Sequence, residues 1–589
     1  MKSPSSGWHR PVPGEKMTTV TTTGQHRTGP RVTRRGLLQG ALLAGATAAA
    51  PSSLARVRAS DIQAYAGADL EALYAPGPYA DPEHHVFMHG VASGDPLPNS
   101  VILWTRVTPS PDAAPGSGVG PDVLLRWEVA EDPEFTRVAR TGAVTAAAMH
   151  DHTVHVDPFG LRPDTVYHYR FTVLDGGHAG RTSPAGRTRT APADGADVEE
   201  LRLAVCSCAN FEAGYFSAYS DIARRAHAGE IDVVVHMGDY LYEYASGEYA
   251  GKYGVVRPHV PTWEIRTLAD YRSRHGHHRR DVELQQAHAA APWVVTWDDH
   301  EIANDSWSGG AEGHDPFHGD WGTRRDAAMQ AYLEWLPVRG ASPSRGGRIY
   351  RSLRYGNLAE VHMLDLRSYR SAPGMMHPAQ RSSIDRTIMG AEQFDWLAGR
   401  LRTADTRWNL IGTSVMMAPL NLVRIDRAVR SQLADMVGVD LAGTPVNVDQ
   451  WDGYVADRNR LLDQLADVHG HGRTVFLTGD IHSEWAGHIH HRDRVVAAEL
   501  VCSSVTAANI DEQLGLGEDN PVSRAAERHV LAHNPHIRHV DLDAHGYATL
   551  TVRPARVEMA WHRVVDVTVA GSPVVAGPVL RYDGARITA

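Results

Sequence analysis

Four polar clusters in this chain of 589 residues each follow a short apolar run, and this repetition restricts the fold more than any other feature. The apolar runs are typical of buried strands, and helical patterns such as 325–336 and 390–401 lie between them. Strand, polar loop and helix in repeated order predict an α/β fold with its site at the carboxyl ends of the strands. The clusters are 207–211, 238–243, 297–305 and 478–482.

Each cluster taken alone has an ordinary explanation. The pair Gly238-Asp239 is typical of a turn, and Asp298 and Asp299 can lie at a helix N-terminus, where acids complement the helix dipole. Turns and caps do not explain why all four clusters occur together, each at the end of a strand. The combination therefore indicates a functional site.

The residue types in these clusters predict a metal centre with more than one ion. Asp239 can bridge two cations through its two oxygens, and cations about 3.5–4 Å apart can clamp the attacking and leaving oxygens of a displacement. Tyr242 can bind as phenolate, which costs roughly 4 kcal/mol at pH 7 and therefore favours a trivalent ion, iron(III). The thiolate of Cys208 costs only about 2 kcal/mol and suits iron. His482 would complete the coordination of that ion.

A second part of the site is predicted from its oxygen donors. Asp299 and Asp480 are hard ligands, suited to one or two Ca²⁺ or another oxygen-preferring divalent ion. His300 is then left to contact the phosphate or to protonate the leaving group. Together with Asp299 it is the expected catalytic pair.

The cysteines need separate assignments. Cys206 lies two residues before Cys208 and would share its face on an ideal strand. We favour a structural Cys206, because Cys208 is nearer the loop. Cys502 follows a strand-like run and is expected to be a packed core thiol. Three cysteines are too few for a disulfide framework.

An all-β region is predicted before these clusters. Alternating apolar and polar residues mark strands at 100–107, 124–129, 153–156 and 166–173. The stretch from Leu161 to Tyr167 is similar to the turn-and-tyrosine signal of fibronectin-type sandwiches. We therefore expect a β-sandwich over 85–190, a linker rich in Pro, Ala, Gly and Asp near 190–196, and the catalytic domain over 198–589.

Residues near the N-terminus follow one another in the order that is typical of an export signal. Arg34 and Arg35 precede a weakly apolar stretch, 36–50, and then small residues. This order predicts a twin-arginine signal over 1–59, read by the twin-arginine export machinery, and a linker over 60–84. The apolar stretch is too short for a stable membrane anchor, so a secreted or cell-surface protein is expected. The alternative is a short buried helix, and Met17 is an alternative start.

The net charge bears on possible partners, and the abundance of histidine bears on how the histidine groups are interpreted. The net charge of −11 gives no basic field for nucleic acid or anionic lipid, except nucleic acid as a substrate. Among 34 histidines, the groups around His275–His278 and His488–His491 are either metal tracts or surface residues that reflect compositional bias. We favour surface residues.

At the four clusters the chain resembles the alkaline phosphatase D family, within the calcineurin-like metallophosphoesterases, from about residue 85 to the C-terminus. The resemblance implies a four-layer β-sandwich flanked by helices, with a dinuclear or trinuclear site between the sheets. Cys208 stands where the wider superfamily has a DxH motif, and Asp299-His300-Glu301 replaces its GNH[DE]. Residues that would support the ligands are Asn210, Asp298, Asp365 and Arg367, although the last two are equally compatible with a buried ion network.

The sequence therefore predicts a secreted phosphoesterase that hydrolyses phosphodiesters and phosphomonoesters by attack of a metal-bound hydroxide. Two alternatives remain open. One is a phospholipase-D-like secreted phosphodiesterase. The other is a non-enzymatic cell-surface protein with a structural metal site, although such sites are expected to be fully coordinated.

Overall fold

The computed structural model describes residues 82–373, 378–420, 447–467 and 472–589. The predicted export signal and nearly all of the 60–84 linker lie outside these ranges. In the part of the chain that is described, no helix has the length and apolar character needed to cross a membrane.

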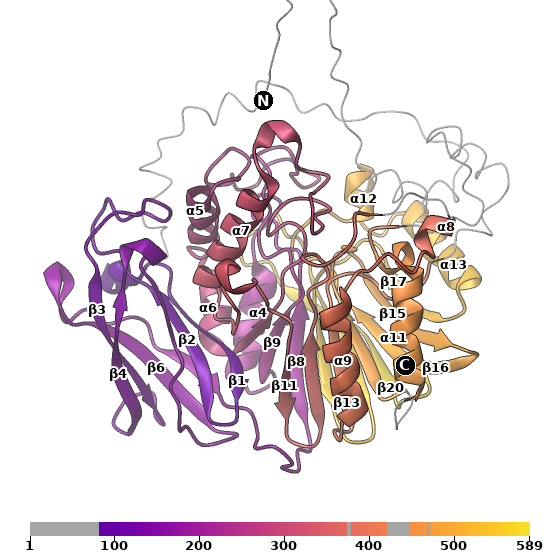
Figure 1. The fold of residues 1–589 in the computed structure, drawn as a ribbon, viewed down its shortest axis with the longest axis horizontal. Coiled ribbons are helices and arrows are strands. Elements are labelled where there is room, and N and C mark those ends of the chain that lie inside the picture. Colours follow the sequence, from indigo (N-terminus) through magenta and orange to yellow (C-terminus); the bar gives the residue numbers. More distant parts are fainter. Residues whose placement is uncertain (1–81, 374–377, 421–446, 468–471) are drawn as a thin grey trace, which may run out of the picture.

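Two large sheets form the centre of the molecule (Figure 1). The first has ten strands in the order β21 (Ile587–Thr588), β20 (Val574–Tyr582), β19 (Val557–Val564), β18 (His545–Val552), β8 (Leu201–Cys206), β9 (Val233–His236), β10 (Trp293–Val295), β1 (Val91–Leu97), β2 (Ser100–Arg106) and β5 (Thr153–Val156). The second has seven in the order β11 (Arg351–Tyr355), β12 (Ala359–Met363), β13 (Trp408–Thr413), β14 (Thr474–Thr478), β16 (Arg494–Val501), β15 (Glu484–His491) and β17 (Ile537–Asp541).

Three apolar cores hold these layers together. One lies between the two sheets and includes Val205, Val235, Leu410 and Leu477. The other two join the outer faces of the sheets to helices. The helices against the ten-stranded sheet are α4 (Ser217–His227), α5 (Leu268–His278), α6 (Val282–Ala290) and α7 (Trp321–Trp335), and those against the seven-stranded sheet are α9 (Ala391–Thr403), α11 (Val455–Asp467) and α13 (Pro521–His533). The predicted four-layer architecture is confirmed.

The strand directions bring the polar clusters to one edge. Strands β8, β9 and β10 run parallel in the first sheet, and β12, β13, β14 and β16 run parallel in the second. Each of the four clusters follows the carboxyl end of one of these strands. Strand β9 is buried along its whole length, so the polar residues that can reach a ligand follow it in the loop.

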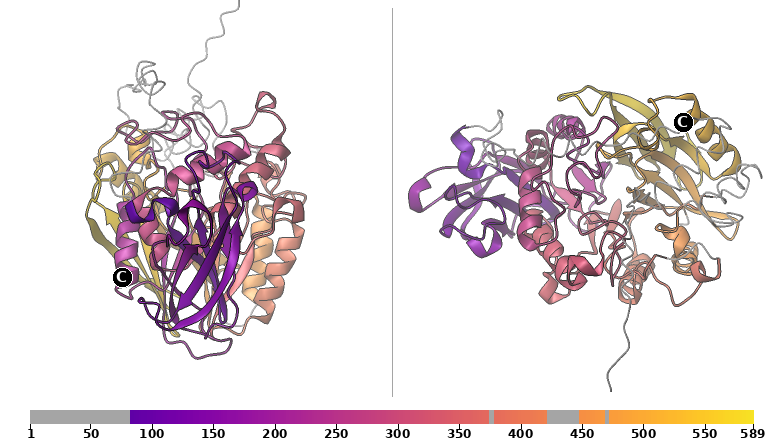
Figure 2. Two further views of the ribbon diagram at one scale, coloured as in Figure 1. Left: turned by 90° about the vertical axis from the view of Figure 1, so that its left-hand side faces the viewer. Right: turned by 90° about the horizontal axis from the view of Figure 1, so that it is seen from above.

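The all-β region near the N-terminus is present, but one of its sheets is not separate. Its four-stranded sheet has the order β4 (Val138–Ala146), β3 (Val123–Ala130), β6 (Val166–Val173) and β7 (Gly186–Arg189). The opposing strands, β1, β2 and β5, belong to the ten-stranded sheet, because β1 pairs in parallel with β10. Figure 2 shows this region packed at one side of the central layers. In the stretch that was compared with the turn-and-tyrosine signal, the Tyr167 hydroxyl accepts a hydrogen bond of 2.9 Å from the Arg162 amide.

The surface assignment of the histidines is wrong for three of them. His275 and His278 on α5 have 1% and 0% exposure, and His488 on β15 has 5%. Helix α5 presents few apolar residues, and it is buried because it packs against α7. A polar pattern alone therefore did not reveal that this helix is an interior element.

Candidate metal centre

Strained backbone marks the positions of the predicted ligands. Cys208, Asp239, Asp480 and His482 all have positive φ values, of 61°, 53°, 65° and 53°. Non-glycine residues rarely adopt this conformation, and it is concentrated at functional sites, where the surrounding structure maintains it. Each residue lies in a loop beyond the carboxyl end of a strand.

Gly238 allows two of these loops to meet. Its φ is 107°, and a Cβ at this position would lie 2.5 Å from the Asp298 Cβ and 2.6 Å from the Asp298 amide nitrogen. Only glycine fits such an approach without a shift of backbone. The loop after β9, which carries Asp239, therefore packs directly on the loop after β10, which carries Asp298 and Asp299.

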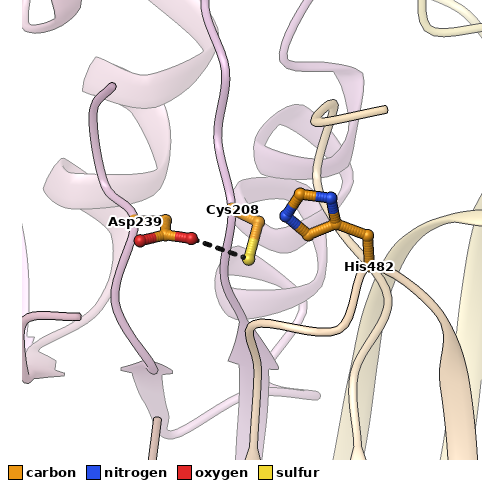
Figure 3. A group of neighbouring side chains, drawn as sticks. All are labelled: Cys208, Asp239 and His482. Atoms are coloured by element: carbon orange, nitrogen blue, oxygen red, sulfur yellow. Dashed lines mark hydrogen bonds between the residues drawn. The ribbon is translucent and has the colours of Figure 1, made fainter. Parts of the chain in front are cut away.

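The first candidate ion position lies among Cys208, Asp239 and His482, whose ligand atoms are all within 4.8 Å of one another (Figure 3). The Cys208 Sγ is 3.5 Å from Asp239 Oδ2. The Tyr242 hydroxyl lies 3.3 Å from the same Asp239 oxygen and 3.2 Å from His482 Nε2. The structure thus brings together sulfur, carboxylate, phenol and imidazole from three different loops.

His482 is oriented by the backbone. Its Nδ1 lies 2.9 Å from the Ala508 carbonyl oxygen, which can only accept a hydrogen bond. The proton is therefore held on Nδ1, and the lone pair of Nε2 faces Cys208 and Tyr242. Such an arrangement is usual for histidines that bind metals.

A second position lies among Asp239, Asp299 and His300, again with ligand atoms within 4.8 Å of one another. His300 Nδ1 is 2.7 Å from Glu243 Oε2, so Nε2 is the ring nitrogen left to face the site. Burial disfavours the charged ring, but the carboxylates of Glu243, Asp299 and Asp239 raise the pKa of His300 to about 10. Nε2 of His300 is therefore available to the site, as a proton donor when the ring is protonated and as an ion ligand when it is neutral.

A third position lies among Asp298, Asp299 and Asp480, all 3% exposed or less. Arg367 donates to both oxygens of Asp298 and lies 3.4 Å from Asp299 and 3.6 Å from Asp480. Gln450 donates to Asp480 Oδ2 at 3.1 Å. This group offers only oxygen donors.

The charges of these acids require a partner. Burial raises the pKa of Asp239 well above its usual value, and Asp299 and Asp298 raise it further, against an opposing effect of His300. Burial also raises the pKa of Asp298 to about 7, although Arg367 opposes it. The pKa of the Cys208 thiol is raised well above its usual value by burial and by Asp239. Ionised groups packed this closely are stable only with cations among them, so the residues fit a multinuclear metal centre.

The predicted supporting residues have distinct positions. Asp365 Oδ1 accepts hydrogen bonds from the amides of Arg367 and Ser368, and so shapes the turn that carries the Arg367 guanidinium. Asn210 donates to the Tyr249 carbonyl at 2.7 Å and connects two loops beside the site. Asp298 is itself one of the third group.

The other two cysteines lie outside the three groups. Cys206 packs in the apolar core between the ten-stranded sheet and its helices. Cys502 packs in the core between the two sheets, with its Sγ 3.4 Å from the Ser207 hydroxyl.

Several residues of the site were not predicted. Asp449 binds Arg367 at 2.7 Å and Arg370 at 2.6 Å, and it has no strand motif before it. Glu301 accepts from the amides of Asp239, Tyr240 and Asp298. Glu243 and Glu301 were inside the predicted clusters, so their acidic character beside Asp239 and His300 was the available signal.

Aromatic rings surround His300. The Tyr242 ring centroid lies 4.3 Å from that of His300, and those of Tyr244 and Tyr249 lie 5.3 and 6.0 Å away. Tyr242 is buried, whereas Tyr244 and Tyr249 are half-buried. They form the wall of the site beside its candidate proton donor.

Comparisons with known proteins agree with this geometry. A family model described as PhoD-like phosphatase matches residues 203–561, and one described as its N-terminal domain matches residues 74–192. The chain is 37% identical to alkaline phosphatase D of Bacillus subtilis (strain 168) over 502 residues, which are 83% of this chain and 79% of that protein. It is also similar to a solved structure titled "Structure of PhoD", with a TM-score of 0.75, 34% identity, and 86% and 93% of the two chains covered.

Proposed function

The chain belongs to the PhoD-like phosphatase family and is a hydrolase of phosphoric esters, and on that premise we propose that it is an exported enzyme with a ferric ion and one or two Ca²⁺. We propose further that it cleaves phosphodiesters at least as well as phosphomonoesters. Its metal ligands would be Cys208, Asp239, Tyr242, Asp299, Asp480 and His482.

One observation carries this proposal: neighbouring candidate positions share carboxylates. Asp239 belongs to the first and second groups, and Asp299 to the second and third. A shared carboxylate can bridge two cations, and paired cations act together on the attacking and leaving oxygens of a phosphate ester. A single structural ion would not need three neighbouring groups that share carboxylates.

The ferric assignment rests on the first group. Thiolate and phenolate are unusual ligands for Ca²⁺, which takes oxygen ligands of the carboxylate and carbonyl type. Burial disfavours ionisation of Cys208, so the ion there must supply a large stabilisation. A trivalent iron does so for both groups. The calcium assignment rests on Asp299 and Asp480, which belong to a group that offers only oxygen donors.

Bound ions would supply a water acidic enough to attack phosphorus near neutral pH, together with positive charge beside the phosphate. Protein groups supply the rest of the chemistry. His300, held by Glu243, would give a proton from Nε2 to the leaving oxygen. Arg367 would keep Asp298, Asp299 and Asp480 in place through charge-assisted contacts.

Export is supported by sequence only. The pair Arg34-Arg35 before an apolar stretch is the pattern read by the twin-arginine route, which carries folded proteins and therefore suits a preassembled metal site. Family membership favours an enzyme over the non-enzymatic binding protein. A phospholipase-D-like activity is the neighbouring alternative within ester hydrolysis.

Metal analysis combined with a substrate panel tests the proposal. We expect near-stoichiometric iron and calcium in the purified protein, hydrolysis of bis-(p-nitrophenyl) phosphate at least equal to that of p-nitrophenyl phosphate, and loss of activity on calcium chelation. Release of choline from phosphatidylcholine as the dominant reaction would favour the alternative. Activity unchanged after prolonged chelation would contradict the calcium assignment.

A further inference from the structure

Arg279 is a buried charge without a counterion. It follows α5 and is fully buried, its guanidinium makes no hydrogen bond of good geometry, and the side-chain acceptor beside it is the hydroxyl of Tyr240. Among the described residues, no carboxylate oxygen lies within 4.0 Å of it. A buried ion is costly unless it is paired.

Other buried arginines of this protein are compensated. Arg106 pairs with Asp151 and donates to two backbone carbonyls. Arg324 pairs with Glu264 at 2.9 Å, and Arg370 with Asp449 at 2.6 Å. Arg274 donates to a set of backbone carbonyls. These four guanidinium groups thus have carboxylate or carbonyl acceptors, whereas the acceptor beside Arg279 is a hydroxyl.

The side chains around Arg279 are aromatic and polar, and the carboxylate bound to this group, Asp151, accepts from Trp335 Nε1 at 3.1 Å and is already paired with Arg106. The Arg279 cluster is defined here as Arg279, Trp104, Trp335, His89, His275 and Tyr240. The guanidinium carbon lies 4.3 Å from the Trp104 ring centroid. Trp104 packs on Trp335, which also contacts the rings of His89 and His275 at centroid distances of 5.1 and 6.4 Å.

The histidines of the cluster also have unfilled hydrogen-bonding capacity. Both ring nitrogens of His89 and of His275 have no partner in the protein, and the two residues are 0% and 1% exposed. Buried polar atoms without a partner need an explanation, and a bound water or ion is the usual one beside a buried charge. Four imidazole nitrogens without partners therefore lie in the same cluster as a guanidinium without a counterion.

No protein group in the cluster supplies negative charge. Burial and the Arg279 charge lower the pKa of His275 to about 3, and the pKa of His89 is also lowered well below its usual value, so both rings are neutral. The Tyr240 hydroxyl lies 3.0 Å from Nε2 of the buried His288. The guanidinium is the only charge of the cluster.

We propose that the Arg279 cluster binds a small inorganic anion of the halide class, with chloride as the physiological ligand and ordered water on the remaining histidine nitrogens. The positive charge of Arg279 requires an anion. Because every surrounding side chain is almost completely buried, that anion must be small. Neutral histidines donate one N–H each, and the guanidinium donates five, which is a suitable set for a halide.

The position of the cluster gives the anion a structural role. Trp104 belongs to β2 at the N-terminal end of the chain, whereas His275 and Trp335 belong to α5 and α7 of the catalytic layers. Tyr240 directly follows the candidate metal ligand Asp239. The anion would therefore join the N-terminal strands to the helices behind the metal centre, without touching substrate.

Anomalous diffraction tests the site directly. Crystals of the intact metal-loaded protein grown in chloride, measured at long wavelength, should give a peak beside the Arg279 guanidinium, because water gives none. Protein exchanged into bromide before crystallisation should give a stronger peak at the same place, visible above but not below the bromine edge. Density that refines as water, without an anomalous signal in either halide, would overturn the proposal.

Thermal unfolding gives an independent test. At constant ionic strength, exchange of gluconate for chloride should raise the unfolding midpoint of the wild-type protein by roughly 1–3 °C through ligand linkage. Arg279→Met should unfold at the same temperature in both salts, whereas the control Arg325→Met, on the surface of α7, should respond as the wild type does. Equal responses of Arg279→Met and the wild type would contradict the site. Should Arg279→Met fail to fold, the diffraction experiment decides alone.

Discussion

The Tyr242 hydroxyl lies 3.2 Å from Nε2 of His482, although 240 residues separate the two side chains in the sequence. Tyr242 follows a strand of the ten-stranded sheet, and His482 follows a strand of the seven-stranded sheet. The first candidate ion position is therefore closed only when the two sheets pack face to face. This relationship explains why metal binding and assembly of the sheets are expected to be coupled.

Tyr242→Phe should remove the phenolate while leaving the ring in place. We expect partial loss of iron and a shift or fading of the visible absorption that phenolate gives with ferric ion. Tyr249→Phe is the matched control, because its ring stacks on Tyr242 at a centroid distance of 5.5 Å but is not a predicted ligand. An unchanged spectrum in Tyr242→Phe would remove Tyr242 from the ligand set.

Glu243→Gln should change the pH dependence of catalysis. The Glu243 carboxylate is the largest of the charges that raise the pKa of His300 to about 10. Without it the pKa falls, so the protonated ring is lost at a lower pH and the alkaline limb of kcat should move to lower pH. The decrease in kcat should be larger for alkyl than for nitrophenyl esters, because nitrophenolate leaves without a proton. Equal decreases for both would argue against His300 as the proton donor.

Arg367→Met should destabilise the protein by about 3 kcal/mol, because removal of one partner leaves the buried carboxylates of Asp298 and Asp449 with less compensation. Denaturant unfolding of the metal-loaded protein measures this loss. Arg581→Gln serves as a comparison, since its ion pair with Glu558 is exposed and should contribute less than about 1 kcal/mol. Similar losses in the two variants would show that the Arg367 network is not needed for stability.

Lysine at both Arg34 and Arg35 should retain the protein in the cytoplasm, because the twin-arginine route reads the pair. Immunoblots of cell and culture fractions measure the distribution, with Arg31→Lys as the control outside the pair. Undiminished secretion of the double variant would remove the argument for this route.

Sequence patterns identified the candidate ligands because these residues lie at strand ends. Cys208, Asp239 and Asp299 each follow a parallel strand of the ten-stranded sheet and so lie at one edge, whereas Asp480 follows β14 of the other sheet and joins them through the packing of the two sheets. Asp449 and Gln450 reach the same place through tertiary packing, with no strand before them, and no local pattern marks them. His275 was assigned to the surface because a helix rich in histidine and arginine looks solvated until the layers that cover it are known.

Paired cysteine variants test the central assignment most directly. Wild-type protein should be coloured and contain near-stoichiometric iron; Cys208→Ser should lose the iron, the colour and most phosphodiesterase activity while remaining folded. Cys206→Ser should keep all three, because that thiol packs in an apolar core two residues away. Loss of iron in Cys206→Ser and its retention in Cys208→Ser would show that the wrong cysteine has been assigned. A wild-type enzyme that is colourless and free of iron, yet fully active, would contradict the ferric centre.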